Sequence, residues 1–395
     1  MTKSLTLSKL CQLRQELEAR HFDRDSEIEG LLVALLARQH ILLLGPPGTG
    51  KSNLASDLCG AIAKARFFRR LLTRTTNAEE VLGVVPPKTL LESEDYIRKT
   101  TGKLPECHIG FLDEIFKCNS VGLNALLSIA NERIFDNGST PQQCPLVTLI
   151  GASNELPDED ENLEALNDRF LLRYWVDQLD DPNTFERFLV MVAEGSRPPM
   201  TTQLTLNELG ELQIQAASLP ISGDAIAALG RLKLALAEEE IQISTRAWGQ
   251  CLGLLRAKAL LDGADEVTEQ HLGILAHVLW KAPEDRETVA RVLKIAGNVL
   301  ELKAAELLAA AKSEVEAVSS HRKQTQVWAE AMASAIANVK AVEQELETLL
   351  GKGQTTANCD RILVQIKTIR ESLVSQISEF WQKPVQKPVT QGAKK

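Results

Sequence analysis

The stretch HILLLGPPGTGKS, residues 40–52, decides the fold of this chain. It opens with a short apolar run that ends in a glycine, which is typical of a strand buried on both faces of a parallel sheet. A glycine-rich loop follows, and a helical pattern continues over residues 53–64. The order of strand, glycine-rich loop and helix predicts an α/β fold.

The loop itself fits the pattern G-x-x-x-x-G-K-[ST]. The backbone amides of such a loop point at phosphate oxygens at a helix N-terminus, and glycines let the chain pass close to the anion. Lys51 is placed to reach the β- and γ-phosphates, and Ser52 is placed to ligate Mg²⁺. We therefore expect Mg-ATP to bind the whole loop: Gly45, Pro46, Pro47, Gly48, Thr49, Gly50, Lys51 and Ser52.

Two further apolar runs end in polar residues, CHIGFLDE at 107–114 and LVTLIGASNE at 146–155. Asp113 is expected to hold Mg²⁺, directly or through water, and Glu114 to polarise the attacking water. An amide side chain at Asn154 could bond both the γ-phosphate and that water. Solvated strand ends and turns carry the same residue types, but downstream of a phosphate loop the catalytic interpretation is favoured.

Composition narrows the classes of function. The formal net charge is −9 and the pI about 5.4, which argues against a sequence-independent nucleic-acid binder, because such a protein needs a basic surface. The Cys and His residues show no metal-binding spacing, and the thiols are interpreted as reduced packing residues. No run reaches the roughly 18 apolar residues of a membrane span. The N-terminus lacks the apolar core of a signal peptide, so a cytoplasmic location is expected.

Helical patterns divide the chain. Residues 26–38 are predicted to form an amphipathic helix, with Ser26 as its N-cap and Glu29 as the reciprocal partner of that cap. Buried strands that alternate with helices predict a parallel sheet covered on both faces. Later patterns predict a helical lid, and then an antiparallel helical hairpin whose two helices are joined by a glycine-containing break. The expected domains are the αβα core 1–190, the lid 191–285, the hairpin 286–381 and a disordered tail 382–395.

Four stretches together resemble the MoxR family of AAA+ ATPases, and most closely its branch named for the regulatory ATPase RavA. They are HILLLGPPGTGKS (40–52), GFLDEIFKCNSVGLNALLSIANERIF (110–135), IGASNELP (150–157) and LEALNDRFLLR (163–173). The resemblance implies an AAA+ core with a helical lid, a hexameric ring, and ATP hydrolysis between subunits. It also implies a protein partner, for example one with a von Willebrand A domain.

The resemblance assigns further residues. Arg169 in LNDRFLLR is similar to the arginine finger that reaches the neighbouring subunit's γ-phosphate, and Arg173 is a lesser candidate. Arg246 in STRAW resembles the second sensor, which reports from the lid to the ATP of its own subunit. Residues 131–133 match the family's NER stretch, and Glu132 is expected in an interface salt bridge. For any one of these arginines, a surface ion pair of little energetic value is the alternative.

The family also implies two insertions in the core that form loops facing a substrate or partner. Residues 82–105 and 135–145 fit such hairpins, and a turn is expected at Asn137–Gly138. The chain departs from the RavA branch at its C-terminal end, where that branch carries a small β-rich domain. A partner that docks on that domain is therefore not expected, and the hairpin would act as a collar on the ring or as a projecting arm.

These observations predict an ATP-driven motor that remodels or assembles a protein partner. Three alternatives remain open. The chain could be a nucleotide-gated oligomeric scaffold with little turnover, a nucleic-acid motor related to replicative helicases, or a chelatase-type motor subunit. The acidic composition disfavours the nucleic-acid motor.

Overall fold

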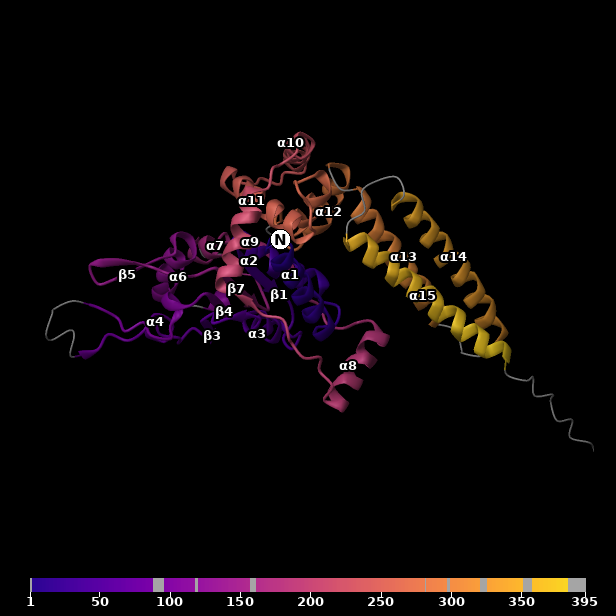
Figure 1. Ribbon diagram of the computed structural model, residues 1–395, viewed down its shortest axis with the longest axis horizontal. Coiled ribbons are helices and arrows are strands. Elements are labelled where there is room, and N and C mark those ends of the chain that lie inside the picture. The colour runs from indigo at the N-terminus through magenta and orange to yellow at the C-terminus, as the bar shows by residue number, and fades with distance from the viewer. Residues whose placement is uncertain are drawn as a thin grey trace, which may run out of the picture. The chain divides into compact units, whose positions relative to one another are not determined.

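The computed structural model describes residues 2–87, 96–117, 120–156, 161–280, 282–296, 299–319, 325–350 and 357–382. They form two compact units, and the second begins at Leu293, in the last turn of α12 (Asp285–Ala296). Figure 1 traces the chain through both units. None of the helices in these ranges is long and apolar enough to cross a membrane.

A five-stranded parallel sheet forms the centre of the first unit. In order across the sheet, its strands are β3 (Phe67–Leu71), β4 (Ile109–Asp113), β7 (Thr148–Ser153), β1 (His40–Leu44) and β8 (Phe170–Trp175). Every residue of β1 and β7 is buried, as expected of strands covered on both faces. The predicted parallel α/β fold is therefore confirmed.

Helices α2 (Asp25–Ala37) and α3 (Lys51–Gly60) pack on the strands of this sheet. The first unit also contains α1 (Thr2–Arg20), α4 (Ala78–Leu82), α6 (Ser120–Glu132), α7 (Glu161–Asn167), the largely exposed α8 (Pro182–Glu194), and the 3₁₀ turns η1 (Leu104–Glu106) and η2 (Ile115–Lys117). The apolar residues of α2 are buried from Ile28 to Leu36, and this helix packs on β1 and β8.

The predicted capping box of α2 is wrong. The helix begins at Asp25, its N-cap is Arg24, and no side chain caps it. Because the helix starts before Ser26, the Glu29 carboxylate is not drawn to the cap. It lies instead 2.9 Å from Arg14 Nη2 and 3.0 Å from Lys258 Nζ, in a buried network between helices.

The lid is helical, as predicted. It contains α9 (Leu206–Ser218), α10 (Gly223–Glu238), α11 (Thr245–Leu261), the 3₁₀ segment η3 (Glu269–His277) and α12. A short parallel pair of strands, β2 (Ile62–Ala63) and β9 (Leu204–Thr205), joins the start of the lid to the core. Helix α11 packs against α2 and α9, so the lid is fixed to the helices that cover the sheet.

One predicted insertion is a hairpin of β5 (Ile134–Asn137) and β6 (Thr140–Gln143), which projects at one end of the core (Figure 1). Its turn contains Gly138 at a φ of 67°. The Asn137 side chain bonds the backbone N and O of Arg98 at 2.7 and 3.1 Å. It thereby ties this hairpin to the other insertion, where Val84 and Lys99 form an antiparallel bridge. Residues 88–95 of that second insertion lie outside the described residues.

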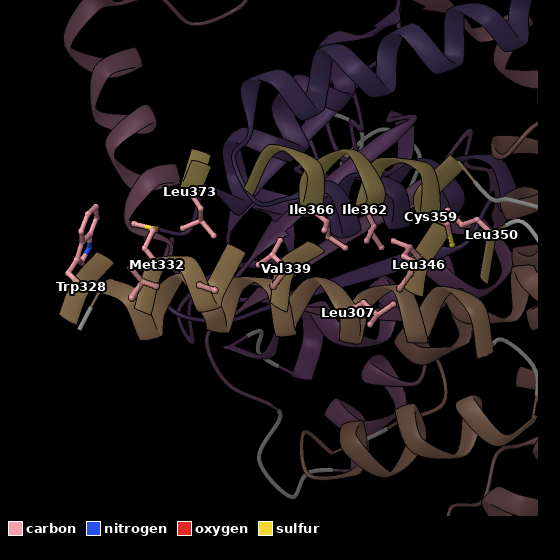
Figure 2. Close-up of a cluster of buried hydrophobic side chains, with 14 of the residues drawn as sticks. Leu307, Trp328, Met332, Val339, Leu346, Leu350, Cys359, Ile362, Ile366 and Leu373 are labelled. Carbon is pink, nitrogen blue, oxygen red and sulfur yellow. The ribbon is translucent and has the colours of Figure 1, made fainter. Parts of the chain in front are cut away.

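The second unit is a bundle of α13 (Val299–Ser319), α14 (Gln326–Leu350) and α15 (Ala357–Gln382). Helices α14 and α15 pair across the glycine-containing break, as predicted, and α13 packs against both. The prediction of two helices over 286–381 is wrong, however, because the stretch predicted as the first helix contains the separate helices α12, α13 and α14. Figure 2 shows the apolar side chains that meet between them, among them Met332, Val339, Ile366 and Leu373. Burial of this stripe explains why the periodicity predicts the helices. The predicted disordered tail lies almost wholly outside the described residues.

Candidate functional site

The phosphate loop leads from the end of β1 into the start of α3. Gly45, Gly48 and Gly50 have φ values of 137°, 83° and 87°, a region that side chains rarely adopt. A Cβ atom on Gly45 would lie 2.2 Å from the carbonyl oxygen of Val176. The glycines therefore allow the loop to pass close to the backbone at Val176 and to expose the amides of the loop.

Lys51 is the first residue of α3, and its ammonium group folds back onto the loop. The Nζ atom donates hydrogen bonds to Gly45 O at 2.7 Å and to Pro46 O at 2.8 Å. Burial lowers the pKa of Lys51, whereas the nearby carboxylates of Asp113 and Glu114 act in the opposite direction. A positive charge is thus held at the helix N-terminus, where anions bind.

Two possible Mg²⁺ ligands lie next to this lysine. Ser52 Oγ donates to Asp113 Oδ2 at 3.4 Å, although the two residues come from different elements, α3 and β4. Mg²⁺ in nucleotide sites is bound by few protein oxygens together with phosphates and water. A hydroxyl and a carboxylate oxygen at this separation fit such a site.

The third strand of this edge brings in Asn154, which follows β7. Its Nδ2 donates a 2.8 Å hydrogen bond to Glu114 Oε1. Glu114 has a φ of 53°, in the left-handed region, because the chain turns sharply from β4 into η2. Strands β4, β7 and β1 are adjacent and parallel, so their carboxyl ends bring Glu114, Asn154 and the loop to one edge, where ligands bind in open α/β sheets.

Two cavities meet at this edge. One, of about 290 Å³, is lined by residues 47–53 together with Asp113, Glu114 and Asn154. The other, of about 650 Å³, shares residues 47–50 and adds Phe22 and Phe188 among other side chains. The rings of Phe22 and Phe188 meet edge to face at 6.4 Å. A polar cavity that opens into a larger aromatic one suits a ligand with a phosphate end and a ring end.

Sequence reasoning selected none of the aromatic residues of the larger cavity. Phe22 comes from the α1–α2 connection and Phe188 from α8, so no local motif joins them. The only indication from the sequence was the helical pattern over 182–194. In the structure, Phe185 and Val192 of this helix line the cavity and are 46% and 59% exposed. Exposed apolar side chains beside a phosphate loop indicate a surface that a ligand or partner covers.

The structure separates the two candidate arginine fingers. Arg173 lies within β8, and its guanidinium donates to the carbonyl oxygens of Val278, Trp280 and Asn167 at 3.2–3.4 Å. Burial lowers the pKa of Arg173 to about 10. Because its donors are used inside its own chain, Arg173 joins the sheet to the lid and is not available as a finger.

Arg169 differs in its surroundings. It lies between α7 and β8, and its Nε atom is buried without a hydrogen-bond partner among the described residues. In the register of the sheet, Phe170 pairs with His40 at the start of β1, whereas Gly45 follows the end of β1. Strand geometry places these two edges about 15 Å apart, so Arg169 does not reach the phosphate loop of its own chain.

Arg246 lies at that same distant edge. Its guanidinium donates to Asn131 Oδ1 near the end of α6, and the preceding residue, Ala130, accepts a 2.7 Å hydrogen bond from His40 Nε2. Contrary to the expectation from the resemblance, the structure does not bring Arg246 to the phosphate loop of its own chain.

Arg133, the last residue of the NER stretch, also lies at the edge of the sheet opposite the phosphate loop. Arg133 Nε donates to Leu146 O at 2.9 Å, and its Nη2 donates to Arg38 O. These carbonyls precede β7 and β1, so Arg133 closes the edge of the sheet opposite the phosphate loop. The interface role expected for Glu132 stays a prediction.

Comparisons with known proteins agree with this architecture. A family model of the MoxR domain in MoxR–vWA–β-propeller ternary systems matches residues 8–214, and a model of an AAA lid domain matches residues 224–293. Two uncharacterised proteins of Methanocaldococcus jannaschii are similar over much of their length. One is 36% identical over 79% of this chain and 83% of the relative, and the other 37% identical over 73% and 74%.

A more distant relative is the chaperone MoxR1 of Mycobacterium tuberculosis, which is 29% identical over 49% of this chain and 51% of that protein. Among solved structures, a candidate ATPase from Cytophaga hutchinsonii superposes with a TM-score of 0.61 and 18% identity, over 74% of this chain and 95% of that one. This last likeness supports the fold alone.

Proposed function

This chain belongs to the MoxR family of AAA+ ATPases, and on that premise we propose that it binds Mg-ATP and hydrolyses it between the subunits of a ring. The observation that carries the proposal is the meeting of three strand ends at one edge: Lys51 after β1, Asp113 and Glu114 at the end of β4, and Asn154 after β7. This set supplies a cation, a metal ligand, a base and a polar amide to one small cavity.

Each residue has a role in the reaction. Lys51 binds the β- and γ-phosphates, while Ser52 and Asp113 hold the metal ion, which would neutralise phosphate charge when bound. Glu114 accepts a proton from the attacking water, and Asn154 orients the γ-phosphate and that water. Catalysis of this kind depends on positioning and electrostatics more than on covalent chemistry.

The larger cavity takes the nucleoside. Phe22 and Phe188 provide aromatic surface next to residues 47–50 of the phosphate loop, and flat rings stack well on such surface. This arrangement supports a nucleotide and disfavours a free phosphate as the ligand.

The position of Arg169 and Arg246 supports hydrolysis between subunits. Both lie at the edge of the sheet opposite the phosphate loop, so in a head-to-tail ring this edge of one subunit meets the nucleotide edge of the next. We propose a hexamer in which Arg169, and with it Arg246, acts on the neighbour's nucleotide.

We propose that the output of the motor is the remodelling or assembly of a protein partner in the cytoplasm, as in the RavA branch. The family description names von Willebrand A proteins in its ternary systems, and a protein of that class is the partner we propose. The scaffold alternative keeps the same site and differs only in turnover.

Glu114→Gln tests this function. The amide is nearly isosteric but cannot accept the water's proton, so ATP should still bind while turnover falls at least a hundredfold in a steady-state phosphate-release assay. Hydrolysis by the variant at the parental rate would remove Glu114 as the base. A parent that binds ATP without turnover would instead favour the scaffold. Affinity capture with the ATP-loaded variant would then identify the partner.

A further inference from the structure

We propose that Lys117 positions the catalytic carboxylate by holding one oxygen of Glu114, which leaves the other oxygen to accept the proton of the attacking water. The inference rests on the ATP hydrolysis proposed above and adds a residue to it. Lys117 lies outside the motif residues on which that proposal rests.

A tight turn brings the two side chains together. Lys117 is the last residue of η2, and its backbone N donates to Glu114 O at 2.9 Å. The left-handed φ of 53° at Glu114 turns the chain back directly after β4. As a result, Lys117 Nζ lies 3.1 Å from Glu114 Oε2.

The two oxygens of the Glu114 carboxylate have different surroundings. Oε2 is buried and accepts no aligned hydrogen bond from the described residues, so the Lys117 ammonium is the ion pair that compensates its burial. Oε1 accepts the 2.8 Å hydrogen bond from Asn154 Nδ2. The side chains of Glu114 and Asn154 both line the smaller cavity. The carboxylate therefore has an inner oxygen at Lys117 and an outer oxygen at the cavity.

This division suggests an order of events. When Asn154 turns to the γ-phosphate it releases Oε1, while Lys117 keeps Oε2 in place. Water then forms its bond to the γ-phosphorus and passes a proton to Glu114 Oε1. The bond from the γ-phosphorus to the bridging oxygen breaks, and ADP leaves with that electron pair. A carboxylate fixed at one oxygen loses less freedom at this step than one free to rotate.

The competing explanation is a solvated surface pair. Lys117 is 44% exposed and also lies 3.8 Å from Glu155 Oε1, on a side chain that is 67% exposed. Exposed pairs of that kind contribute little. Glu155→Gln therefore serves as the matched control, since it removes the exposed partner of Lys117 and leaves the buried one.

Kinetics of the full-length chain decide between the two explanations. Lys117→Met should lower kcat about tenfold, because the base loses its fixed orientation, while the KM and Kd for ATP stay within about twofold of the parent. Lys117→Arg should recover most of the loss, and Glu155→Gln should match the parent. In a Glu114→Gln background, Lys117→Met should cause no further loss, because it acts through Glu114.

Three results would overturn the proposal: parental kcat in Lys117→Met, an equal loss of kcat in Glu155→Gln, or a loss of ATP affinity that parallels the loss of kcat. If Lys117→Met melts early, Lys117→Gln replaces it as the variant without a charge. A parent that does not hydrolyse ATP refutes the proposed function and this inference together. A parent that hydrolyses ATP, with Lys117→Met unchanged, refutes only the role of Lys117.

Discussion

Lys51 Nζ donates a 2.7 Å hydrogen bond to the carbonyl oxygen of Gly45, the first residue of the phosphate loop. A second bond runs to Pro46 O, and the lysine is only 7% exposed. Phosphate oxygens would have to replace these carbonyls as acceptors. The affinity that Lys51 gives to ATP is therefore the difference between two sets of hydrogen bonds, and it is smaller than the full strength of a lysine–phosphate contact.

Lys51→Ala should weaken ATP binding roughly 10- to 100-fold, as expected for the loss of one charge-assisted hydrogen bond worth about 1.5–3 kcal/mol. Isothermal calorimetry measures the Kd. Lys340→Ala, at an exposed position of α14 in the second unit, is the control and should bind like the parent. Unchanged affinity in Lys51→Ala would contradict the assignment of the phosphate loop.

The nucleotide edge is predictable from sequence because its parts are local. The contact between Gly45 and Lys51 spans six residues, and a glycine pattern encodes it directly. Asp113 and Asn154 each end an apolar run, and adjacent parallel strands carry both residues to the same edge. No residue beyond these runs is needed to place them.

The opposite edge is not predictable in the same way. No strand is predicted over 170–175, because the run is short and Arg173 interrupts it. In the structure this arginine is buried against carbonyls more than 100 residues later in the chain. The contact of Arg246 with Asn131 is equally distant in sequence. A hydrogen-bond acceptor that tertiary packing brings to an arginine leaves no local sequence pattern. The sequence therefore singled out Arg173 and Arg246 but did not predict where their side chains lie.

Glu27 gives the first unit a dependence on pH. Burial raises the pKa of this carboxyl to about 7, while Arg24 opposes that shift. The folded state therefore favours the protonated form, and its contribution to stability is fully present below about pH 4.5 and is lost as the pH rises through about 7. Glu27→Gln cannot ionise and escapes this loss.

The Glu27→Gln variant should consequently gain stability over the parent as the pH rises, by at most about 3 kcal/mol. Urea unfolding of both proteins at pH 5 and pH 8.5 measures the difference. The gap should be small at the lower pH and wide at the higher one. A gap independent of pH would show that Glu27 does not titrate in this range.

Lys258 links the lid to the core at a fully buried position. Its side chain is 1% exposed and lies 3.0 Å from both the Glu29 and the Asp262 carboxylates. Lys258→Met should destabilise the first unit by about 3–5 kcal/mol, because it leaves two buried carboxylates without this cation. Arg231→Met, which breaks the exposed pair with Glu269, should cost less than about 1 kcal/mol.

Denaturant midpoints measure both variants, and the double variant Lys258→Met with Glu29→Gln provides a second check. In the double variant the charge of Glu29 is also removed, so Glu29 no longer repels Asp262. Part of the lost stability should therefore be recovered. Equal effects of Lys258→Met and Arg231→Met would show that the buried network does not stabilise the junction.

Arg169→Ala should bind ATP almost normally and hydrolyse it very slowly. An arginine finger contributes roughly 10³–10⁵ in rate by stabilising charge in the transition state, and Arg169 cannot reach its own loop across the sheet. Arg173→Ala is the contrasting variant. Because Arg173 donates to carbonyls of the lid, its removal should lower the melting temperature, which Arg169→Ala should leave unchanged.

Mixed rings test whether Arg169 acts on the neighbouring subunit. The assay uses an ATP concentration well below the Kd of the Lys51→Ala variant. Lys51→Ala subunits then lack bound nucleotide and Arg169→Ala subunits lack a finger, so neither hydrolyses ATP appreciably alone. In a mixed ring, a Lys51→Ala subunit can present its intact Arg169 to a neighbour whose phosphate loop is intact, so phosphate release should partly return. Light scattering and two affinity tags first establish that the subunits mix. Proven mixed rings without recovered turnover would refute the action of Arg169 across the interface, and since Arg173 is buried in its own chain, the finger would then have to come from another residue.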